Sequence, residues 1–479
     1  MAKLYVFGIG GTGSRVLRSF TMLLAAGVNI DKDGNNPITE VIPVIIDPDR
    51  QNGDLTRTVS LMNDYKNIHK NLKFTKESKN RFFKTEISSV LQNFTLLIKD
   101  TDDKKFKDFM DYSMLSKENK SLVDMLFSER NLDSSMDVGF KGNPNIGSVV
   151  LNQVPMSDDF TTVMNNFQNG DKIFIISSVF GGTGASGFPL LLKTLRTNKT
   201  MPNFANINNA LIGAVTVLPY FGVKTDDNSE IESSTFISKA KAAMGYYEKN
   251  IIGNGDINAL YYLADEQKNS YDNHEGMSDQ QNDAHLIELL AATAIVDFCN
   301  NGELMSGQTN NYELGLKDGV DTVTFKSFYN GLADMLRQNM TQFVIMANAF
   351  LDEFDYLKSN RLTANTKLKL NENFYSTQFI RNLRKFFDLY RSWLNEMKQN
   401  KRSLNLFNLE CGNRPFSVVT DVTYKKSHNP FKKIFKEYEF IYGELNSAAK
   451  KISSDSEEND LLEMFYRATE KLVNNKFNF

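Results

Sequence analysis

The sequence predicts an α/β fold with a parallel, Rossmann-like sheet and a mainly helical C-terminal region. Two apolar runs lead into glycine-rich turns and then into helical periodicity, near residue 8 and near residue 181. This order is typical of a buried strand, a tight turn and a covering helix. Beyond residue 300, apolar residues recur mostly at helical spacing, which predicts a different architecture there.

Composition indicates an ordinary globular protein. The chain has 479 residues, enough for one large or two ordinary domains, with 41% hydrophobic and 24% charged residues. A formal charge of −3 gives no reason to expect nucleic-acid binding, and no apolar run is long enough to span a membrane. Cys299 and Cys411 lie far apart without a CxxC partner, which argues against disulfides and zinc and favours a cytoplasmic location.

The first glycine turn follows the apolar run Lys3 to Phe7. It reads GIGGTGSRVLRSF over Gly8 to Phe20, and apolar residues then recur at helical spacing. Glycines at such a corner let the backbone approach an anion, and the peptide N–H groups of the following helix face it. The pattern alone is shared by dehydrogenases, adenylating enzymes and GTPases.

A second strand is predicted over Glu40 to Ile46 (EVIPVII), and it ends at Asp47 and Asp49. Carboxylates at the carboxyl end of a parallel strand lie where open α/β sheets bind ligands. They could meet a ribose hydroxyl or a phosphate-bound Mg²⁺, whereas the alternative is a solvated Asp-Pro-Asp turn.

Residues 51–137 are predicted to form a mostly helical insertion, with helical patterns over Phe82 to Phe94 and Phe106 to Leu126. The loop Gly139 to Gly147 (GFKGNPNIG) follows. Its exposed N–H donors are suited to a further phosphate-binding nest.

The second glycine turn is the stretch SSVFGGTGASGFPLLLKTLR, Ser177 to Arg196. It follows a strand predicted over Asp171 to Val179 and opens a helix. Here Gly181, Gly182, Gly184 and Gly187 permit close approach of a ligand, and Thr183 and Ser186 add hydroxyl donors. The alternative is a turn that only packs helix against strand.

Further strands are predicted at Leu211 to Leu218 and Ile257 to Leu263, and a centrally buried helix at Asp283 to Phe298. We place a domain boundary near residue 300, giving a nucleotide-binding domain at 1–300 and a mainly helical domain at 301–479. In the latter, only Pro415 to Thr423 alternates like a strand.

Taken in order, four segments resemble the nucleotide-binding domain of the tubulin/FtsZ superfamily. GIGGTGS looks like its first glycine loop, IDPDR lies where the family has acidic or amide residues, and GNPNIG is similar to GGNPEIG of FtsZ. GGTGASG is similar to the signature GGGTG(S/T)G, from which it departs at Phe180 and Ala185.

The resemblance implies a GTP-binding domain that holds the nucleotide and Mg²⁺ through these loops. Asn282 or His285 would lie beside the base, the alternatives being a helix cap for Asn282 and a surface position for His285. Carried over by position, Asp47 and Asp49 would hold the metal, and the nucleotide-binding residues would be Gly10, Gly11, Thr12, Ser14, Asp47, Asp49, Gly142, Asn143, Gly181, Gly182, Thr183, Gly184, Ala185, Ser186, Gly187 and Asn282.

The family hydrolyses GTP when an acid after the central helix reaches the nucleotide of the next subunit. By resemblance, Glu303, Glu313, Asp318 or Asp321 would supply this acid, with Asp321 favoured because a helix-like stretch follows it, although the segment lacks the expected Asn/Asp-x-Asp spacing. Ordinary loop solvation is the alternative for each. The resemblance therefore implies a GTPase that assembles with itself or with a protein partner.

Two other functions remain open, and an NAD(P) oxidoreductase comes last because no catalytic Tyr-Lys, Cys or His arrangement stands out. A nucleotide-regulated scaffold without turnover would fit the missing acid and the helical C-terminal region. An ATP-dependent adenylating enzyme of the ubiquitin-activating kind would share the first glycine turn and the Asp-x-Asp, and Arg50 or Arg57 would imitate its catalytic arginine. That class gives no reason for the second glycine turn.

Overall fold

The computed structural model describes residues 2–32, 37–137, 139–140, 142–223, 235–271, 278, 280–314, 316, 320–329, 331–425, 437–453 and 455–479. Its main sheet has seven parallel strands in the order β3-β2-β1-β4-β5-β7-β9. The strands are β1 (Ala2–Ile9), β2 (Ile38–Ile46), β3 (Glu86–Ile87), β4 (Lys172–Ser178), β5 (Ile212–Val217), β7 (Ala259–Leu263) and β9 (Asn310–Glu313). The predicted α/β fold with a parallel sheet is confirmed.

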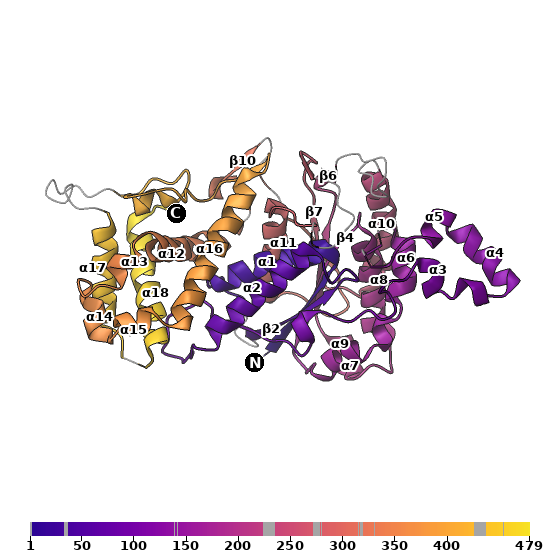
Figure 1. Ribbon diagram of the computed structural model, residues 1–479, viewed down its shortest axis with the longest axis horizontal. Coiled ribbons are helices and arrows are strands. Elements are labelled where there is room, and N and C mark those ends of the chain that lie inside the picture. Colours follow the sequence, from indigo (N-terminus) through magenta and orange to yellow (C-terminus); the bar gives the residue numbers. More distant parts are fainter. Residues whose placement is uncertain are drawn as a thin grey trace.

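Helices cover both faces of this sheet (Figure 1). One face carries α1 (Gly10–Ala25), α2 (Gly53–His69) and α11 (Leu286–Asn300), and the other carries α6 (Pro144–Leu151), α8 (Gly182–Thr197) and α10 (Phe236–Asn250). Strands β1 and β4 are buried almost throughout because both faces are covered. Helix α11 is buried on nearly all sides, as its apolar sequence predicts.

The C-terminal region is mainly helical, as predicted, and packs on the α1 and α2 side of the sheet (Figure 1). Its main helices are α12 (Leu332–Asp352), α16 (Gln378–Gln399), α17 (Tyr438–Ala449) and α18 (Glu457–Lys476). Helix α16 contacts α2, so one continuous apolar cluster runs from the sheet into this region. A short parallel pair joins β10 (Thr322–Val323) to β11 (Ser403–Leu404).

Residues 51–137 divide into two parts in the structure. Helix α2 packs on α1, and β3 forms the edge of the main sheet, so both belong to the sheet layer. The later residues form an arm that projects at the far end from the C-terminal helices (Figure 1). It contains α3 (Phe106–Phe109), α4 (Lys117–Leu126) and α5 (Glu129–Leu132). Since β9 comes from the predicted second domain, the 1–300 and 301–479 division stays a prediction.

Two local predictions are wrong. The segment Phe82 to Phe94 is not a helix: it contains β3, and Phe83 and Asn93 have φ angles of 55° and 50°, which a right-handed helix does not allow. The segment Pro415 to Thr423 is not a strand, because Pro415 opens the short 3₁₀ helix η8 (Pro415–Val418). None of the helices in the described parts of the chain has the length and apolarity needed to cross a bilayer.

An aromatic cluster joins the sheet layer to the C-terminal helices. Phe343 on α12 is fully buried, and its ring centroid lies 5.3 Å from Phe82, 5.7 Å from Phe83 and 4.8 Å from Tyr390 of α16. Such edge-to-face ring pairs add to the free energy gained by burial.

We expect Phe343→Ala to lower the free energy of unfolding by about 3–5 kcal/mol, because it leaves a cavity among these rings. Urea denaturation followed by circular dichroism measures the loss. The control is Phe479→Ala, since Phe479 is 37% exposed and should change stability by less than about 1 kcal/mol. Equal losses in the two variants would contradict this role for Phe343.

Candidate functional site

Two glycine corners meet at the carboxyl ends of β1 and β4. These strands are neighbours in parallel register, so the turns after Ile9 and after Ser178 open at the same edge of the sheet. A Cβ added at Gly10 would lie 3.3 Å from the Cβ of Thr183 and 3.6 Å from the amide nitrogen of Gly184. Gly10 also has a φ of +71°, which favours glycine. The two predicted phosphate loops are therefore in contact.

The loop before α6 closes on the second corner from the other side. A Cβ at Gly182 would lie 3.1 Å from the amide nitrogen of Asn143 and 3.2 Å from that of Gly142. Gly184 in turn packs on the backbone of Ser178, 2.8 Å from where its Cβ would be. Three of the segments predicted from the sequence thus come together, and the missing side chains let them do so.

The helices that start at the two corners lack side-chain caps. Their N-cap residues, Ile9 and Gly181, make no side-chain cap hydrogen bond, and neither first turn contains an acid. By contrast, Asn52, Ser157 and Thr377 cap α2, α7 (Asp158–Asn165) and α16. Uncapped N–H groups and the positive ends of two helix dipoles at one place favour an anion.

The first corner also has space and an unused hydroxyl. A Cβ at Gly11 would meet no atom within 4 Å among the described residues. Beside it, the Ser14 hydroxyl is buried and has no hydrogen-bond partner in the described part of the chain. A buried hydroxyl without a partner costs free energy, which an acceptor such as a phosphate oxygen would recover. These residues fit the predicted anion.

Asp47 and Asp49 lie at the end of β2, next to the first corner. They are 6% and 3% exposed, and the Asp49 amide donates to Asp47 Oδ1 at 3.1 Å. Burial, with the nearby Asp49 carboxylate, raises the pKa of Asp47 to about 7. Two buried carboxylates suit a hard cation that takes its remaining ligands from phosphate and water. Within the described residues, no group of three potential protein ligands surrounds a metal position.

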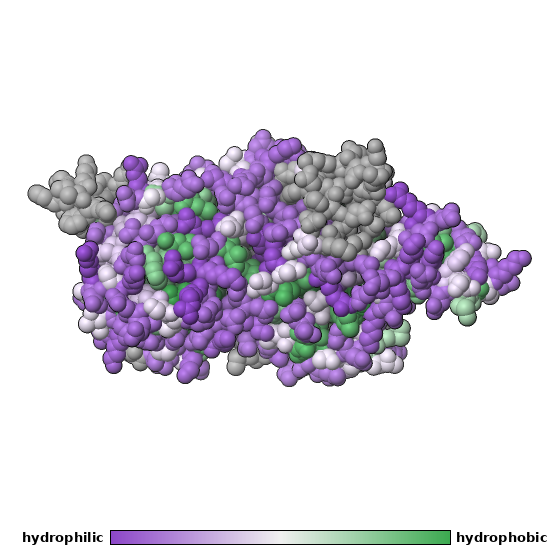
Figure 2. All heavy atoms as spheres, in the orientation of Figure 1, coloured by the Kyte–Doolittle hydropathy of each residue, from purple (hydrophilic) through white to green (hydrophobic). Residues whose placement is uncertain are grey.

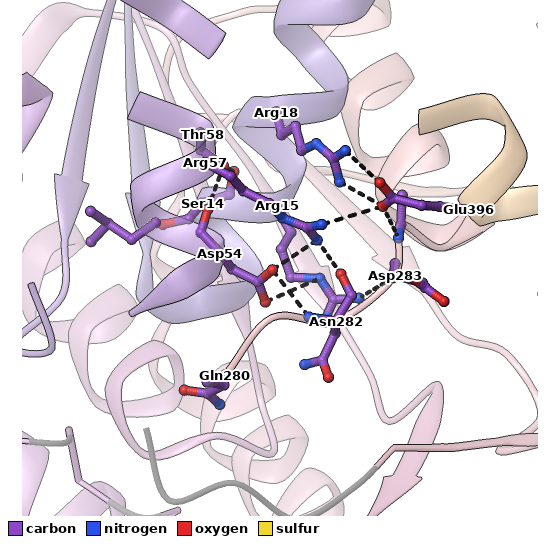
Figure 3. Close-up of polar contacts among 12 residues, drawn as sticks. Ser14, Arg15, Arg18, Asp54, Arg57, Thr58, Gln280, Asn282, Asp283 and Glu396 are labelled. Atoms are coloured by element: carbon purple, nitrogen blue, oxygen red, sulfur yellow. Dashed lines mark hydrogen bonds and ion pairs between the residues drawn. The ribbon is translucent and has the colours of Figure 1, made fainter. Parts of the chain in front are cut away.

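A buried network of ion pairs ties α1 to the segment before α11. Arg15 pairs with Glu288 of α11. The backbone carbonyl of the preceding residue, Ser14, accepts a hydrogen bond from the Thr58 hydroxyl. Arg15 Nη2 also donates to the Asp283 carbonyl at 3.1 Å. Figure 3 shows Arg15, Thr58 and Asp283 lying close to one another, from α1, α2 and the chain before α11.

The same network reaches the C-terminal region through Glu396 of α16. Both oxygens of Glu396 accept hydrogen bonds from Arg18 at 2.7 Å, and one also accepts from the Ala284 amide at 2.8 Å. Arg57 bridges Asp54 and Glu396 (Figure 3). Sequence reasoning named Arg57 only as a substitute catalytic arginine and missed Arg15, Arg18, Asp54, Glu288 and Glu396. The available signal was charged side chains within apolar helices, as at Arg15, Arg18 and Glu288.

Several predicted site residues have structural roles. The Asn143 side chain caps α6 by accepting from Asn145 N at 3.1 Å. The Ser186 hydroxyl donates to the Gly182 carbonyl at 2.8 Å, and Gly187 packs on Ile9. Ala185 is half-buried beside these groups. In this structure the second corner offers a ligand its backbone and Thr183, which is half-buried.

Asn282 joins the ion-pair network through its backbone. Its N–H donates to Asp54 Oδ1 at 3.3 Å, and its carbonyl accepts a hydrogen bond from Arg57. His285 is buried rather than on the surface, and its ring caps α11. Burial, with the charge of Arg15, lowers the pKa of His285 to about 3, so the ring is neutral at pH 7.

Of the predicted catalytic acids Asp318 and Asp321, the structure describes Asp321. Asp321 is exposed and its Oδ1 lies 2.5 Å from Lys268 Nζ, an ion pair that lowers the pKa of Asp321. Asp318 lies outside the described residues. Their roles remain predictions.

No protein-family model and no curated protein matches this sequence. Among solved structures, the chain is similar to CetZ2 of Haloferax volcanii, from a GTPγS-bound protofilament, with 14% identity over 63% of this chain and 59% of that one, at a TM-score of 0.30. It is also similar to CetZ of Methanosaeta thermophila (15% identity, 63% and 51% coverage, TM-score 0.24). A third is TubZ of Bacillus thuringiensis serovar israelensis, from a GTPγS-form protofilament (12% identity, 55% and 47% coverage, TM-score 0.23).

CetZ and TubZ are proteins of the tubulin/FtsZ family, and the structural similarity of this chain to them is distant. The match covers less than two thirds of each of these relatives. With identities of 12–15% and TM-scores of 0.23–0.30, these similarities carry no argument, and the proposals below rest on the geometry of this chain.

The raised pKa of Asp47 makes a prediction for stability. Its folded pKa of about 7 lies above the usual value of about 3.9, so the folded state binds more protons between these values and loses stability as pH rises through them. Asp47→Asn removes this loss. In buffer with chelator and without nucleotide, its gain over the original protein should grow by about 2–3 kcal/mol from pH 5 to pH 8.

Urea denaturation at the two pH values measures the difference. The control is Asp102→Asn, because the Asp102 side chain is 74% exposed and should give the same difference at both. A gain of Asp47→Asn that does not change with pH would show that Asp47 is not held in a buried, cation-free position.

Proposed function

We propose that this protein binds GTP with Mg²⁺ at the meeting point of the two glycine corners, and that it is a GTPase whose turnover depends on assembly with itself or with a protein partner. The contact between Gly10 and Thr183 carries the proposal, because it brings two uncapped helix starts to one place. Two such N-termini can share the charge of one polyphosphate. The two free, buried cysteines favour a cytoplasmic setting.

Each part of the site has a proposed task. The backbone N–H groups of Gly10, Gly11, Thr12, Gly181, Gly182, Thr183 and Gly184 would bind phosphate oxygens, together with the loop at Gly142. The Ser14 hydroxyl would donate to one of these oxygens. Asp47 and Asp49 would hold Mg²⁺, whose charge would offset the negative charge that builds on the phosphates. Asn282 would lie on the base side of the pocket.

Hydrolysis requires an acid that orients water, and we propose Asp321 or Asp318 for this role. Asp321 is exposed and paired with Lys268, so a second subunit could reach it. Turnover that rises more steeply than linearly with protein concentration would support assembly-dependent hydrolysis. GTP binding with no turnover at any concentration would favour the nucleotide-regulated scaffold.

An adenylating enzyme is the less favoured alternative. Its catalytic arginine would have to be Arg50 or Arg57. Arg57 is held by Asp54 and Glu396, and Arg50 pairs with Asp102 on the surface. ATP–pyrophosphate exchange tests this activity directly, and fluorescent GTP displaced by unlabelled ATP or NAD tests base preference.

We expect Gly11→Leu to reduce GTP affinity at least 100-fold while the protein stays folded. A Cβ at Gly11 meets no protein atom within 4 Å, so the side chain should occupy only the space proposed for phosphate. The matched control is Gly443→Leu, which is also helical and also has open space around its Cβ. Fluorescent GTP titration measures affinity, and circular dichroism checks folding.

A folded Gly11→Leu variant with unchanged GTP affinity would exclude the first corner as the phosphate site. Loss of affinity in Gly443→Leu as well would mean that the effect is not local.

A further inference from the structure

A groove separates α6, α8 and α10 on the sheet face opposite α11. Its volume is about 770 Å³. Met156, Leu190, Ala242 and Tyr246 give it an apolar lining, and Met156 and Tyr246 are exposed to 78% and 49%. Contiguous exposed apolar surface of this kind marks interaction sites more often than ordinary surface.

The charge of the groove is one-sided. Lys193 and Lys239 line it, and no acidic side chain is among its described lining residues. Its occupant should therefore combine an apolar face with acidic flanks.

The arm of the same chain has these properties. Helix α4 buries none of its residues, and Leu122, Met125 and Leu126 are 55%, 84% and 60% exposed. Their spacing of i, i+3 and i+4 places them on one face of the helix. Figure 2 shows hydrophobic side chains exposed among hydrophilic ones along the projecting arm. Glu118 lies on the same side of the helix as this face, at i−4 from Leu122, whereas Lys117, Lys120 and Asp124 lie on the other side.

The arm is held in its projecting position by its base. Phe106 and Phe127 are buried in the core on this side of the sheet, with ring centroids 4.9 Å apart. Helix α4 lies at the tip, pointing away from α6, α8 and α10 of its own chain (Figure 1). If α4 folded back into the groove of its own chain, Phe127 would leave the core, and the free energy gained by burying its ring would be lost.

Building on the assembly proposed above, we propose that α4 of one copy docks into the α6/α8/α10 groove of a second copy. An amphipathic helix that lays i, i+3 and i+4 apolar residues into a groove is a common mode of protein recognition. Because the two surfaces differ, each copy offers one arm and one groove, and the contact repeats head to tail.

Two variants with opposite defects test this contact. Met125→Lys disables the arm, because it places a cation against Lys193 and Lys239, and Ala242→Trp fills the groove. Sedimentation velocity over a range of concentrations should show self-association of the original protein, weakened at least tenfold in either variant. An equimolar mixture of the two should form a discrete heterodimer, since only one intact arm and one intact groove remain. Met305→Lys is the matched control, as Met305 is 61% exposed elsewhere.

Cysteine cross-linking tests the contact between α4 and the groove independently. Cys299 and Cys411 are buried, so background reaction should be low. A Met125→Cys variant mixed with a Thr197→Cys variant should form a disulfide-linked dimer, whereas each variant alone should not.

Three results would overturn the contact: an original protein that stays monomeric, association unaffected by Met125→Lys, or variants that do not associate when mixed. Cross-linking of Met125→Cys with itself would indicate an arm-to-arm contact instead and would also overturn it. Fluorescent GTP binding by the Met125→Lys variant should be unchanged because the arm tip is far from the glycine corners (Figure 1). Ala242→Trp is left out of this comparison, since Gly181 and Ala185 of the second corner also line the groove. If the original protein associates but does not bind GTP, only the proposal of nucleotide binding is refuted.

Discussion

The close approach of β1 and β4 at their carboxyl ends is the constraint on which the rest of the structure depends. Parallel neighbours end at the same edge of a sheet, so their turns compete for one volume. The missing side chain at Gly184 lets the second turn close on itself, since a Cβ there would lie 2.8 Å from the Ser178 backbone. The missing side chain at Gly10 lets the two turns approach, since a Cβ there would lie 3.3 Å from the Cβ of Thr183. With that contact in place, α1 and α8 start side by side and diverge to opposite faces of the sheet. The acids after β2 then fall beside the first corner by strand order alone.

Much of this arrangement could be predicted from the sequence. Strands β1, β2, β4 and β5 are short apolar runs, and a glycine turn or an acidic turn ends several of them. Helix α11 is nearly all apolar, which is decisive for a buried central helix. Such elements are specified locally, and tertiary contacts did not alter them.

The predictions failed where the local pattern was ambiguous. Phe82 to Phe94 has apolar residues at helical spacing, but the aromatic rings turn toward Phe343, more than 200 residues away, and the backbone takes positive φ angles to allow it. The pairing of Arg18 with Glu396 spans 378 residues and leaves no periodic signal. Long-range ion pairs depend on how helices pack, which a single sequence does not display.

The buried network has an energetic consequence for the first glycine corner. Removing one member of a buried ion pair leaves an uncompensated charge, which costs about 3–5 kcal/mol. Arg15 directly follows Ser14 of the first corner, and Glu396 belongs to α16, so the same penalty holds the first corner, the start of α11 and the C-terminal helices in one register. A displacement of any of these would have to break several hydrogen-bonded charges together.

Helix α8 lies on the opposite face of the sheet and, like α1, connects a glycine corner with a second part of the molecule. Its first turn forms the second glycine corner, while Ala185, Leu190 and Lys193 further along it line the groove. An anion at the corner and a helix in the groove would therefore contact one rigid element from two sides. If either ligand shifts α8 relative to β4, thermodynamic linkage requires that each changes the affinity of the other by the same factor. A tightly packed corner with no room for a Cβ makes such a shift costly, so any such coupling would act through a few discrete arrangements of α8 rather than through gradual movement.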